Sequence, residues 1–260
     1  MKALDQNSDQ LVDFINKLPL ITAGFWIMKI TATTLGETGG DWLSMTMGMG
    51  YLVSTLIFFV LFIFAVGGQL ISKRHHPFLF WTVIIATSTA GTTMSDYMDR
   101  TLELGYTMGA LILVTILFSL LALWRYTVGN VSVDNIRTRK AELFYWITIL
   151  FSNTLGTALG DFLADDSGLG FLGSWLLISG VLGLILAANY FTKINKIILF
   201  WIAFILTRPF GATFGDVLTK THEKGGLDFG RGLSSLILLG ILVLAIRWFY
   251  FRKNRTIAMI

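Results

Sequence analysis

The chain has 260 residues, of which 54% are hydrophobic and only 14% are charged, and its mean hydropathy is +0.69. This composition departs from that of a soluble domain in the direction of a membrane protein. The sequence contains no cysteine, which excludes disulfides, thiolate metal sites and cysteine nucleophiles. No nucleic-acid partner is expected, because orientation in a bilayer explains the net charge of +4 better.

Eight stretches of the sequence are candidates for membrane-spanning helices, each of which needs about 20 largely apolar residues. They predict an all-α polytopic membrane protein whose main partner is the lipid bilayer. The first 19 residues show neither the basic n-region nor the cleavage site of a signal peptide. The predicted spans are residues 20–41, 47–70, 78–97, 104–126, 142–162, 171–191, 197–217 and 232–251.

Basic residues alternate between the two sides of the predicted spans. Fourteen lysines and arginines fall in the terminal segments and in every second connection, whereas the other connections carry only Arg100, Lys220, Lys224 and Arg231. By the positive-inside rule, both termini are cytoplasmic. A bacterial inner membrane is the expected location.

One frame of residues occurs four times along the chain. In each copy a glycine follows a tryptophan by ten residues, a glycine or serine follows it by fourteen, and an aspartate by fifteen. This spacing indicates an internal repeat with two spans in each unit. The copies are Trp26, Gly36, Gly40 and Asp41; Trp81, Gly91, Ser95 and Asp96; Trp146, Gly156, Gly160 and Asp161; and Trp201, Gly211, Gly215 and Asp216.

The spacing between copies predicts two halves. The tryptophans are 55, 65 and 55 residues apart, so the first unit maps onto the third and the second onto the fourth with one offset. Each unit crosses twice, and the predicted 2+2 pseudo-symmetry therefore has its axis along the membrane normal. The predicted parts are a cytoplasmic segment at 1–19, repeats 1 and 2 at 20–126, a cytoplasmic linker at 127–141, repeats 3 and 4 at 142–251, and a cytoplasmic tail at 252–260.

Four tandem units of two spans, each with its tryptophan at Trp26, Trp81, Trp146 or Trp201, resemble a bacterial membrane-protein family catalogued as a repeat of unknown function. The resemblance covers nearly the whole chain and implies an integral membrane protein of four repeats. It implies no activity, so the function has to be argued from the residues.

The two helices of each unit differ in character. The second is an apolar run that is typical of a helix facing lipid, whereas the first gathers small and polar residues on one face. Small residues four positions apart allow membrane helices to approach closely. We therefore expect the first helices of the four units to form an inner ring, packed through Gly36, Gly40, Gly91, Ser95, Gly156, Gly160, Gly211 and Gly215.

The aspartate of each copy lies near the outer end of the first helix, where it meets the negative end of the helix dipole. Gathered carboxylates repel one another unless cations or protons neutralise them. Carboxylate, hydroxyl and amide oxygens suit hard cations such as Mg²⁺, Ca²⁺ or Mn²⁺. The predicted cation ligands are Asp41, Asp96, Asp161 and Asp216, and the predicted pathway continues along Glu37, Thr33, Ser88, Asn153 and Thr157.

Three further ionisable residues, Lys29, Glu37 and Arg208, occur in the spans without counterparts in the other repeats. Charges at such depth are costly unless they are paired or hydrated. If the units close into a ring, Glu37 comes within reach of Arg208, and we expect either a gate or a fixed structural ion pair. Lys29 has no partner evident in the sequence, and we expect it to face a water-filled cavity.

No signature of catalysis is present, and we expect neither an enzyme nor a bound cofactor. The sequence lacks a phosphate-binding loop, an HExxH motif, a Ser-Lys arrangement and the Gly-x-Gly-Asp form of intramembrane aspartyl proteases. His75, His76 and His222 fall in connections and are expected to be solvated. The eight tryptophans and 21 phenylalanines are expected to face mainly lipid and the membrane interfaces.

These expectations favour a transporter that moves a hard divalent cation through the ring, with Mn²⁺ as one candidate and exchange against protons as one version. A second interpretation is a membrane scaffold or regulator, in which the motif only packs helices and the basic 127–141 segment binds a partner. A third is the export of a small organic solute, in which Lys29 and Arg208 are essential and the aspartates dispensable. The sequence does not define an oligomeric state.

Overall fold

The computed structural model describes residues 19, 21–72, 76–131, 136 and 138–251, and within these ranges the protein is helical and contains no strand. Residues 1–18 of the predicted segment at 1–19 and the whole predicted tail at 252–260 therefore lie outside the described residues, as do His75 and parts of the 127–141 linker. The α-helices are α2 (Ala23–Asp41), α3 (Tyr51–Ile71), α4 (Pro77–Asp96), α5 (Gly105–Val128), α6 (Arg139–Asp161), α7 (Gly170–Phe191), α8 (Lys196–Thr219) and α9 (Arg231–Ile246).

Seven of these helical segments are long and apolar enough to cross a membrane, and their ends lie within a few residues of the predicted spans. The prediction of eight spans therefore has direct support for seven. The remaining helix is α2, whose hydropathy is lowered by Lys29, Glu37 and a run of threonine and glycine. Protein rather than lipid covers α2, since 14 of its 19 residues are buried.

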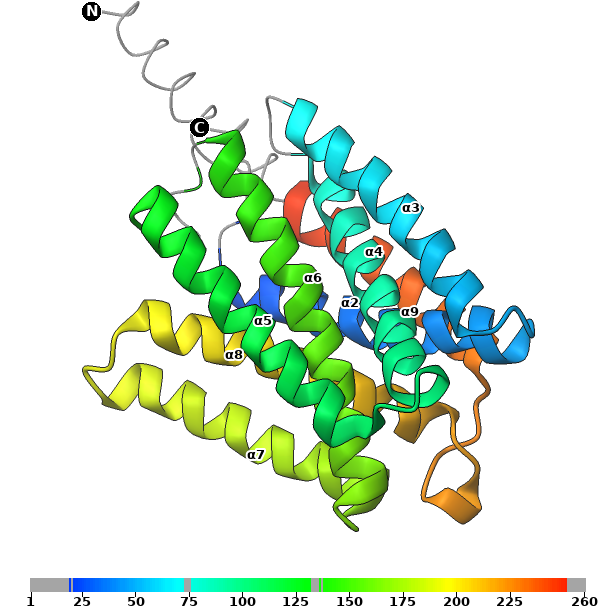
Figure 1. Ribbon diagram of the computed structural model, residues 1–260. Coiled ribbons are helices and arrows are strands. Elements are labelled where there is room, and N and C mark those ends of the chain that lie inside the picture. The colour runs from blue at the N-terminus through cyan, green and yellow to red at the C-terminus, as the bar shows by residue number, and fades with distance from the viewer. Residues whose placement is uncertain (1–18, 20, 73–75, 132–135, 137, 252–260) are drawn as a thin grey trace, which may run out of the picture.

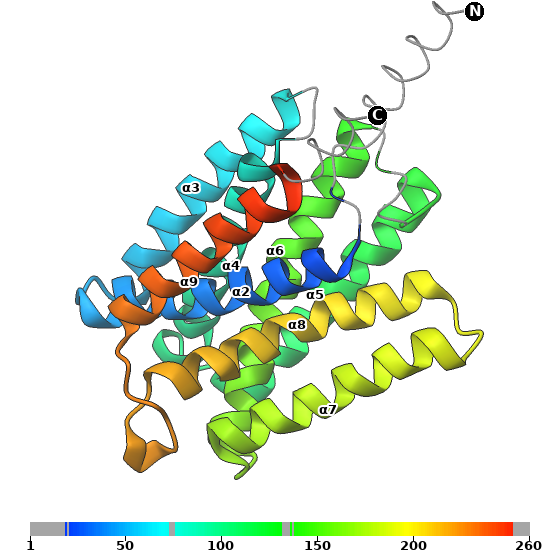
Figure 2. The same ribbon diagram turned by 180° about the vertical axis from the view of Figure 1, so that it is seen from behind.

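The first helices of the four repeats form a closed inner ring. Helix α2 packs against α4, α4 against α6, α6 against α8, and α8 against α2 again. Figure 1 shows α4 and α6 in front of α2, and Figure 2 shows α2 and α8 from the opposite side. The expectation that the small and polar faces belong to inner helices agrees with this packing, because those faces are the buried ones.

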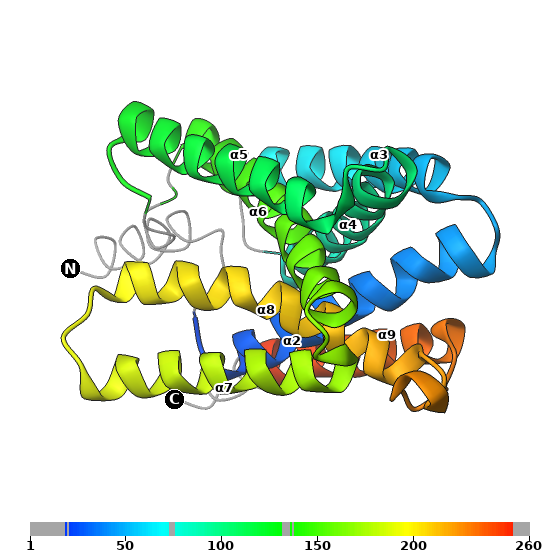
Figure 3. The same ribbon diagram turned by 60° about the horizontal axis from the view of Figure 1, so that its bottom comes forward.

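Each outer helix leans on the inner helix of the following repeat. Helix α3 packs on α4, α5 on α6, and α7 on α8, where the pair runs antiparallel (Figure 3). The last outer helix, α9, packs on α2 and so joins the end of the chain to its beginning (Figure 2). The outer helices expose most of their leucine, isoleucine, valine and phenylalanine side chains, as expected of surfaces that face lipid.

The glycine ten residues after each tryptophan forms the contact between adjacent inner helices. In every repeat, a methyl group on that glycine would lie too close to the residue on the next inner helix that stands seven positions after its tryptophan, with distances under 3.0 Å at three junctions and of 3.1 Å at Gly91. The same relation holds at all four junctions, including the one that closes the ring. The pairs are Gly36 with Ser88, Gly91 with Asn153, Gly156 with Arg208, and Gly211 with Thr33.

Aromatic side chains close one end of the ring, in a layer that we call the aromatic collar. In each repeat an aromatic residue precedes the tryptophan, and at three junctions its ring lies 5.6–5.8 Å from the tryptophan of the neighbouring repeat. These collar pairs are Phe25 with Trp81, Phe80 with Trp146, and Phe200 with Trp26. The fourth junction differs, because Trp124 of α5 lies between the two residues there. Its ring centroid is 6.4 Å from that of Tyr145 and 5.8 Å from that of Trp201.

The expectation that the tryptophans face mainly lipid is wrong for four of the five collar tryptophans, whereas the fifth, Trp26, is half-buried. Trp81, Trp124 and Trp146 have no exposed surface, and Trp201 retains 6%. Their flat rings fill the space between helices that diverge away from the glycine contacts.

The connection between the two halves of the chain packs against the ring. Helix α5 ends at Val128 and α6 begins at Arg139, so the predicted linker at 127–141 includes the ends of both helices. The indole N–H of Trp201 donates to the carbonyl oxygen of Val131 at 3.1 Å, and Ile136 is buried in the core. At these points the linker is anchored to the fourth repeat.

Alanine substitution tests the glycine contacts. A methyl group at Gly156 would lie 2.5 Å from Cβ of Arg208, whereas one at Gly240 on α9 would meet nothing within 4 Å. We expect Gly156→Ala to lower the free energy of unfolding by about 1–3 kcal/mol, and Gly240→Ala to leave it nearly unchanged. Unfolding in mixed detergent micelles measures both variants, and equal stability of the two would contradict the packing described here.

Candidate functional site

Two layers of side chains from the inner helices, all polar except Ala212, fill the middle of the ring. We call them the waist. The first layer stands seven residues after each tryptophan and the second eleven residues after it. All eight residues are buried, with exposures of 4% or less. The waist comprises Thr33, Ser88, Asn153 and Arg208 in the first layer and Glu37, Thr92, Thr157 and Ala212 in the second.

Arg208 connects all four inner helices at the waist. From α8, its Nη2 donates to Oε2 of Glu37 on α2 at 2.8 Å, to Oγ1 of Thr157 on α6 at 2.8 Å, and to the hydroxyl of Thr92 on α4. Its Nη1 lies 3.4 Å from the carbonyl oxygen of Thr33. The structure thus brings Glu37 and Arg208 together as an ion pair, and three helices share the guanidinium.

Lys29 lies at the level between the waist and the collar and has no exposed surface. Its Nζ donates to Oδ1 of Asn153 at 3.4 Å and lies 4.2 Å from the ring centroid of Phe204, a cation–π arrangement. The amide nitrogen of Asn153 donates in turn to Oγ1 of Thr87 at 3.0 Å. An amide and an aromatic face surround the ammonium group where we expected a cavity.

The hydroxyl groups predicted to line the pathway bond across the helix contacts. Thr33 donates to the carbonyl of Thr207 at 3.1 Å, and Ser88 to the carbonyl of Thr33 at 3.5 Å. Thr157 accepts from Arg208 and donates to the carbonyl of Asn153 at 3.3 Å. These groups lie on the ring interior, but in this structure they are engaged with neighbouring helices.

Thr92 is a waist residue that sequence reasoning passed over. Its hydroxyl bonds Arg208, lies 3.3 Å from Oε2 of Glu37, and reaches the carbonyl of Gly36 at 3.2 Å. The signal was its position, because Thr92 stands eleven residues after Trp81 exactly as Glu37 follows Trp26.

At the other end of the ring, the four aspartates are almost fully buried, with exposures of 2–4%. In three repeats the α-helix continues past the aspartate as one turn of π-helix, formed by η1 (Trp42–Thr46), η2 (Tyr97–Thr101) and η4 (Phe162–Asp166). Such single π turns often occur at functional positions, and the hydrophobic pattern carries no sign of them. In the fourth repeat α8 ends at Thr219, and the longer loop that follows contains η5 (His222–Lys224).

Basic side chains neutralise the aspartates. Arg100 pairs with both Asp96 at 3.0 Å and Asp161 at 3.4 Å, and it reaches the more exposed Asp165 at 3.9 Å. Two further pairs are Lys220 with Asp216 at 3.1 Å and Arg231 with Asp41 at 3.3 Å. A signal for these partners was present in the charge distribution, since Arg100, Lys220 and Arg231 are three of only four basic residues assigned to that side.

The loop residue Lys220 shows the strength of this pairing. Burial opposes its positive charge, but the carboxylates of Asp216 and Asp41 outweigh burial and raise the pKa of the ammonium group above its usual range. Lys220 therefore stays charged at physiological pH.

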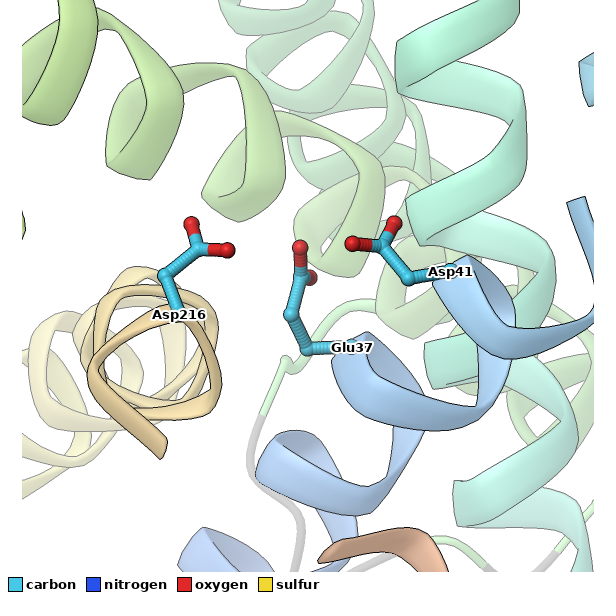
Figure 4. Close-up of side chains that lie close together, drawn as sticks. All are labelled: Glu37, Asp41 and Asp216. Atoms are coloured by element: carbon cyan, nitrogen blue, oxygen red, sulfur yellow. The ribbon is translucent and has the colours of Figure 1, made fainter. Parts of the chain in front are cut away.

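Three carboxylates converge between α2 and α8, as Figure 4 shows. One oxygen each from Glu37, Asp41 and Asp216 lies within 4.8 Å of the other two, and all three residues are buried. We call this group the carboxylate cluster. In the described part of the chain, Asp96 and Asp161 do not join it, so the four aspartates predicted as one ligand set divide into two pairs. Glu37 joins the cluster to the waist because its Oε2 also binds Arg208.

A family model described as Repeat of Unknown Function (DUF347) matches the chain four times, at residues 24–75, 79–130, 144–195 and 199–255. Each match begins two residues before a motif tryptophan and covers one inner and one outer helix. No curated protein and no solved structure matches the chain.

A double-mutant cycle tests the ion pair of the waist. Arg208→Met leaves Glu37 buried without its partner, and we expect a loss of about 3–5 kcal/mol in the free energy of unfolding. Combining it with Glu37→Gln removes the stranded charge, so the double variant should be more stable than the sum of the two single losses implies. Arg125→Met, at an exposed position of α5, is the control and should change little. Strict additivity of the two single effects would show that the charges do not interact.

Proposed function

This chain belongs to the Repeat of Unknown Function (DUF347) family, and we propose that its ring of four repeats is a membrane transporter for a hard divalent cation, with Mn²⁺ as one candidate. The proposal places the carboxylate cluster towards the outside and both termini in the cytoplasm of a bacterial cell, in line with the distribution of basic residues. It assigns no catalysis to the chain.

The carboxylate cluster carries the proposal. Glu37, Asp41 and Asp216 come from two helices of the ring, and their oxygens lie close enough together to share one ion. Ligands made only of oxygen suit Mg²⁺, Ca²⁺ and Mn²⁺ rather than softer metals. Buried carboxylates in a membrane protein are costly and usually serve an ion pathway.

Competition for the same carboxylates supplies a gating step. In the structure, Arg208, Lys220 and Arg231 each bind one acid of the cluster. An entering divalent cation brings two positive charges to these oxygens and weakens the hold of Glu37 on Arg208. Because Arg208 links α8 to the other inner helices, its release loosens the waist on the side where the cation has bound.

Below the waist, the same proposal requires two further changes. Lys29 repels a cation that enters the ring, so it has to move aside or give up its proton. The aromatic collar has to part, since its rings lie in contact between neighbouring repeats. The structure then corresponds to the closed form of the pathway, and exchange against protons is one version of the cycle.

One observation favours a second candidate function, the export of a small organic solute. Lys29 and Arg208 place two basic side chains in the interior of the ring, and Glu37 is the acid that pairs with Arg208. A solute with an acidic group would find complementary charge there. In that case Lys29 and Arg208, rather than the aspartates, are required for flux.

A scaffold or regulator is the third candidate. The glycine contacts and the basic partners of the aspartates give each motif residue a structural role without any transport. The candidates therefore predict different fluxes for variants in which asparagine replaces the aspartates, because this change removes the charge and keeps the size of the side chain.

Flux in proteoliposomes tests the cation proposal. The variant Asp41→Asn/Asp216→Asn keeps the size of both side chains but removes two of three ligands, and we expect Mn²⁺ flux to fall about tenfold or more. Asp166→Asn, an exposed acid at the same end of the ring, is the matched control and should transport normally. A monodisperse elution profile confirms that each variant is folded.

The outcome that contradicts this proposal is unchanged flux after all four aspartates are replaced by asparagine. If Lys29→Gln alone then abolishes the export of a solute, the second candidate replaces the first. Growth of a deletion strain across a panel of metals and toxic solutes supplies the substrates to be tried.

A further inference from the structure

The third repeat lacks a large side chain that the second repeat uses to fill a groove. Trp124 follows Trp81 by the same 43 residues by which Asn189 follows Trp146, and the two matched repeats are equal in length. Asn189 of α7 therefore occupies the position that Trp124 holds on α5. An asparagine is much smaller than a tryptophan, so the two grooves cannot be filled alike.

In the second repeat, the tryptophan seals its groove. The ring of Trp124 lies 6.4 Å from Tyr145 on α6 and 5.8 Å from Trp201 on α8, and it has no exposed surface. The groove between α5, α6 and α8 is thus packed with aromatic rings.

The corresponding groove of the third repeat is open. It lies between α7, α8 and the start of α2, and the residues that match Tyr145 and Trp201 are Phe200 and Trp26. A cavity of about 700 Å³ occupies this place and is lined by Trp26, Phe200, Gly183, Leu186 and Asn189, among others. Its volume lies within the range of pockets that hold small ligands.

The lining of the cavity is amphipathic. Aliphatic and aromatic side chains from all three helices form most of it, and polar groups gather where α7 ends and α8 begins. Lys196, the first residue of α8, lies at this polar end with Asn189 and Tyr190. Such a site offers an apolar slot for a hydrocarbon chain beside a positively charged rim.

We propose that this cavity binds one anionic phospholipid, with an acyl chain between α7, α8 and α2 and the phosphate at Lys196. The cavity opens on the apolar outer surface of the ring, where lipid is the available ligand, and the charge of its rim selects an anionic headgroup. The inner end of the cavity reaches Thr207, the neighbour of Arg208, so the acyl chain supports the contact between α2 and α8. The proposal does not depend on what the ring transports.

Native mass spectrometry of the full-length protein, delipidated and then incubated with phosphatidylglycerol or phosphatidylcholine, tests this site. We expect the wild-type protein to retain one phosphatidylglycerol in preference to phosphatidylcholine. Asn189→Trp restores the tryptophan of the second repeat and should abolish retention. Lys196→Gln removes the charge of the rim and should reduce the preference for phosphatidylglycerol by about fivefold.

Two glycines of α7 provide a matched pair that does not depend on how Asn189→Trp folds. Both Gly180 and Gly183 have open space where a side chain would point, but only Gly183 lines the cavity. Gly183→Leu should therefore displace the lipid, and Gly180→Leu should not. Equal lipid retention in Gly183→Leu, Gly180→Leu and the wild type would overturn the proposal, as would equal retention of the two phospholipids by the wild type.

Discussion

The close approach of adjacent inner helices at a glycine is the constraint on which the rest of this structure depends. At each of the four junctions, the absence of a side chain on one helix creates the space for a polar or charged side chain on the next. Without that space, the aliphatic part of the Arg208 side chain could not pass Gly156, and its guanidinium could not reach the other inner helices. Burying so many polar groups is tolerable only because this packing also brings each one to a partner.

The three layers of the ring have different chemistry because they lie at different distances from those contacts. Where the helices touch, hydroxyl groups, one amide, the Glu37 carboxylate and the Arg208 guanidinium form a hydrogen-bonded waist. Where the helices diverge at one end, aromatic rings fill the gap. At the other end the aspartates meet basic residues that follow in the loops and the outer helices. A single repeated sequence therefore produces the aromatic collar at one end, the polar waist in the middle and the buried aspartates with their basic partners at the other end.

Much of this architecture follows from the sequence, because spacing is what a repeat preserves. The spacing of tryptophan, glycine and aspartate predicted which helices are the inner ones. Closing the four units into a ring then predicted that Glu37 comes within reach of Arg208. The surroundings of Lys29 and the pairs of Arg100 with Asp161 and of Arg231 with Asp41 depend on which side chains from distant segments share one level, and periodicity does not report that. The pairs of Arg100 with Asp96 and of Lys220 with Asp216 instead join residues four positions apart in the chain. The prediction for the tryptophans was wrong because this residue type occurs both at membrane interfaces and in protein cores. Trp81, Trp124, Trp146 and Trp201 are here buried between helices.

The way in which each outer helix leans on the following repeat has a consequence for the order of assembly. Helix α2 carries a lysine and a glutamate into the interior, and it is the helix whose composition suits lipid least. Its two ring neighbours are α4 and α8, and its outer cover is α9, the final helix. The arginine that neutralises Glu37 is made 171 residues later. During synthesis, the inner helix that is least suited to lipid is thus only partly covered by protein until the last repeat has been made.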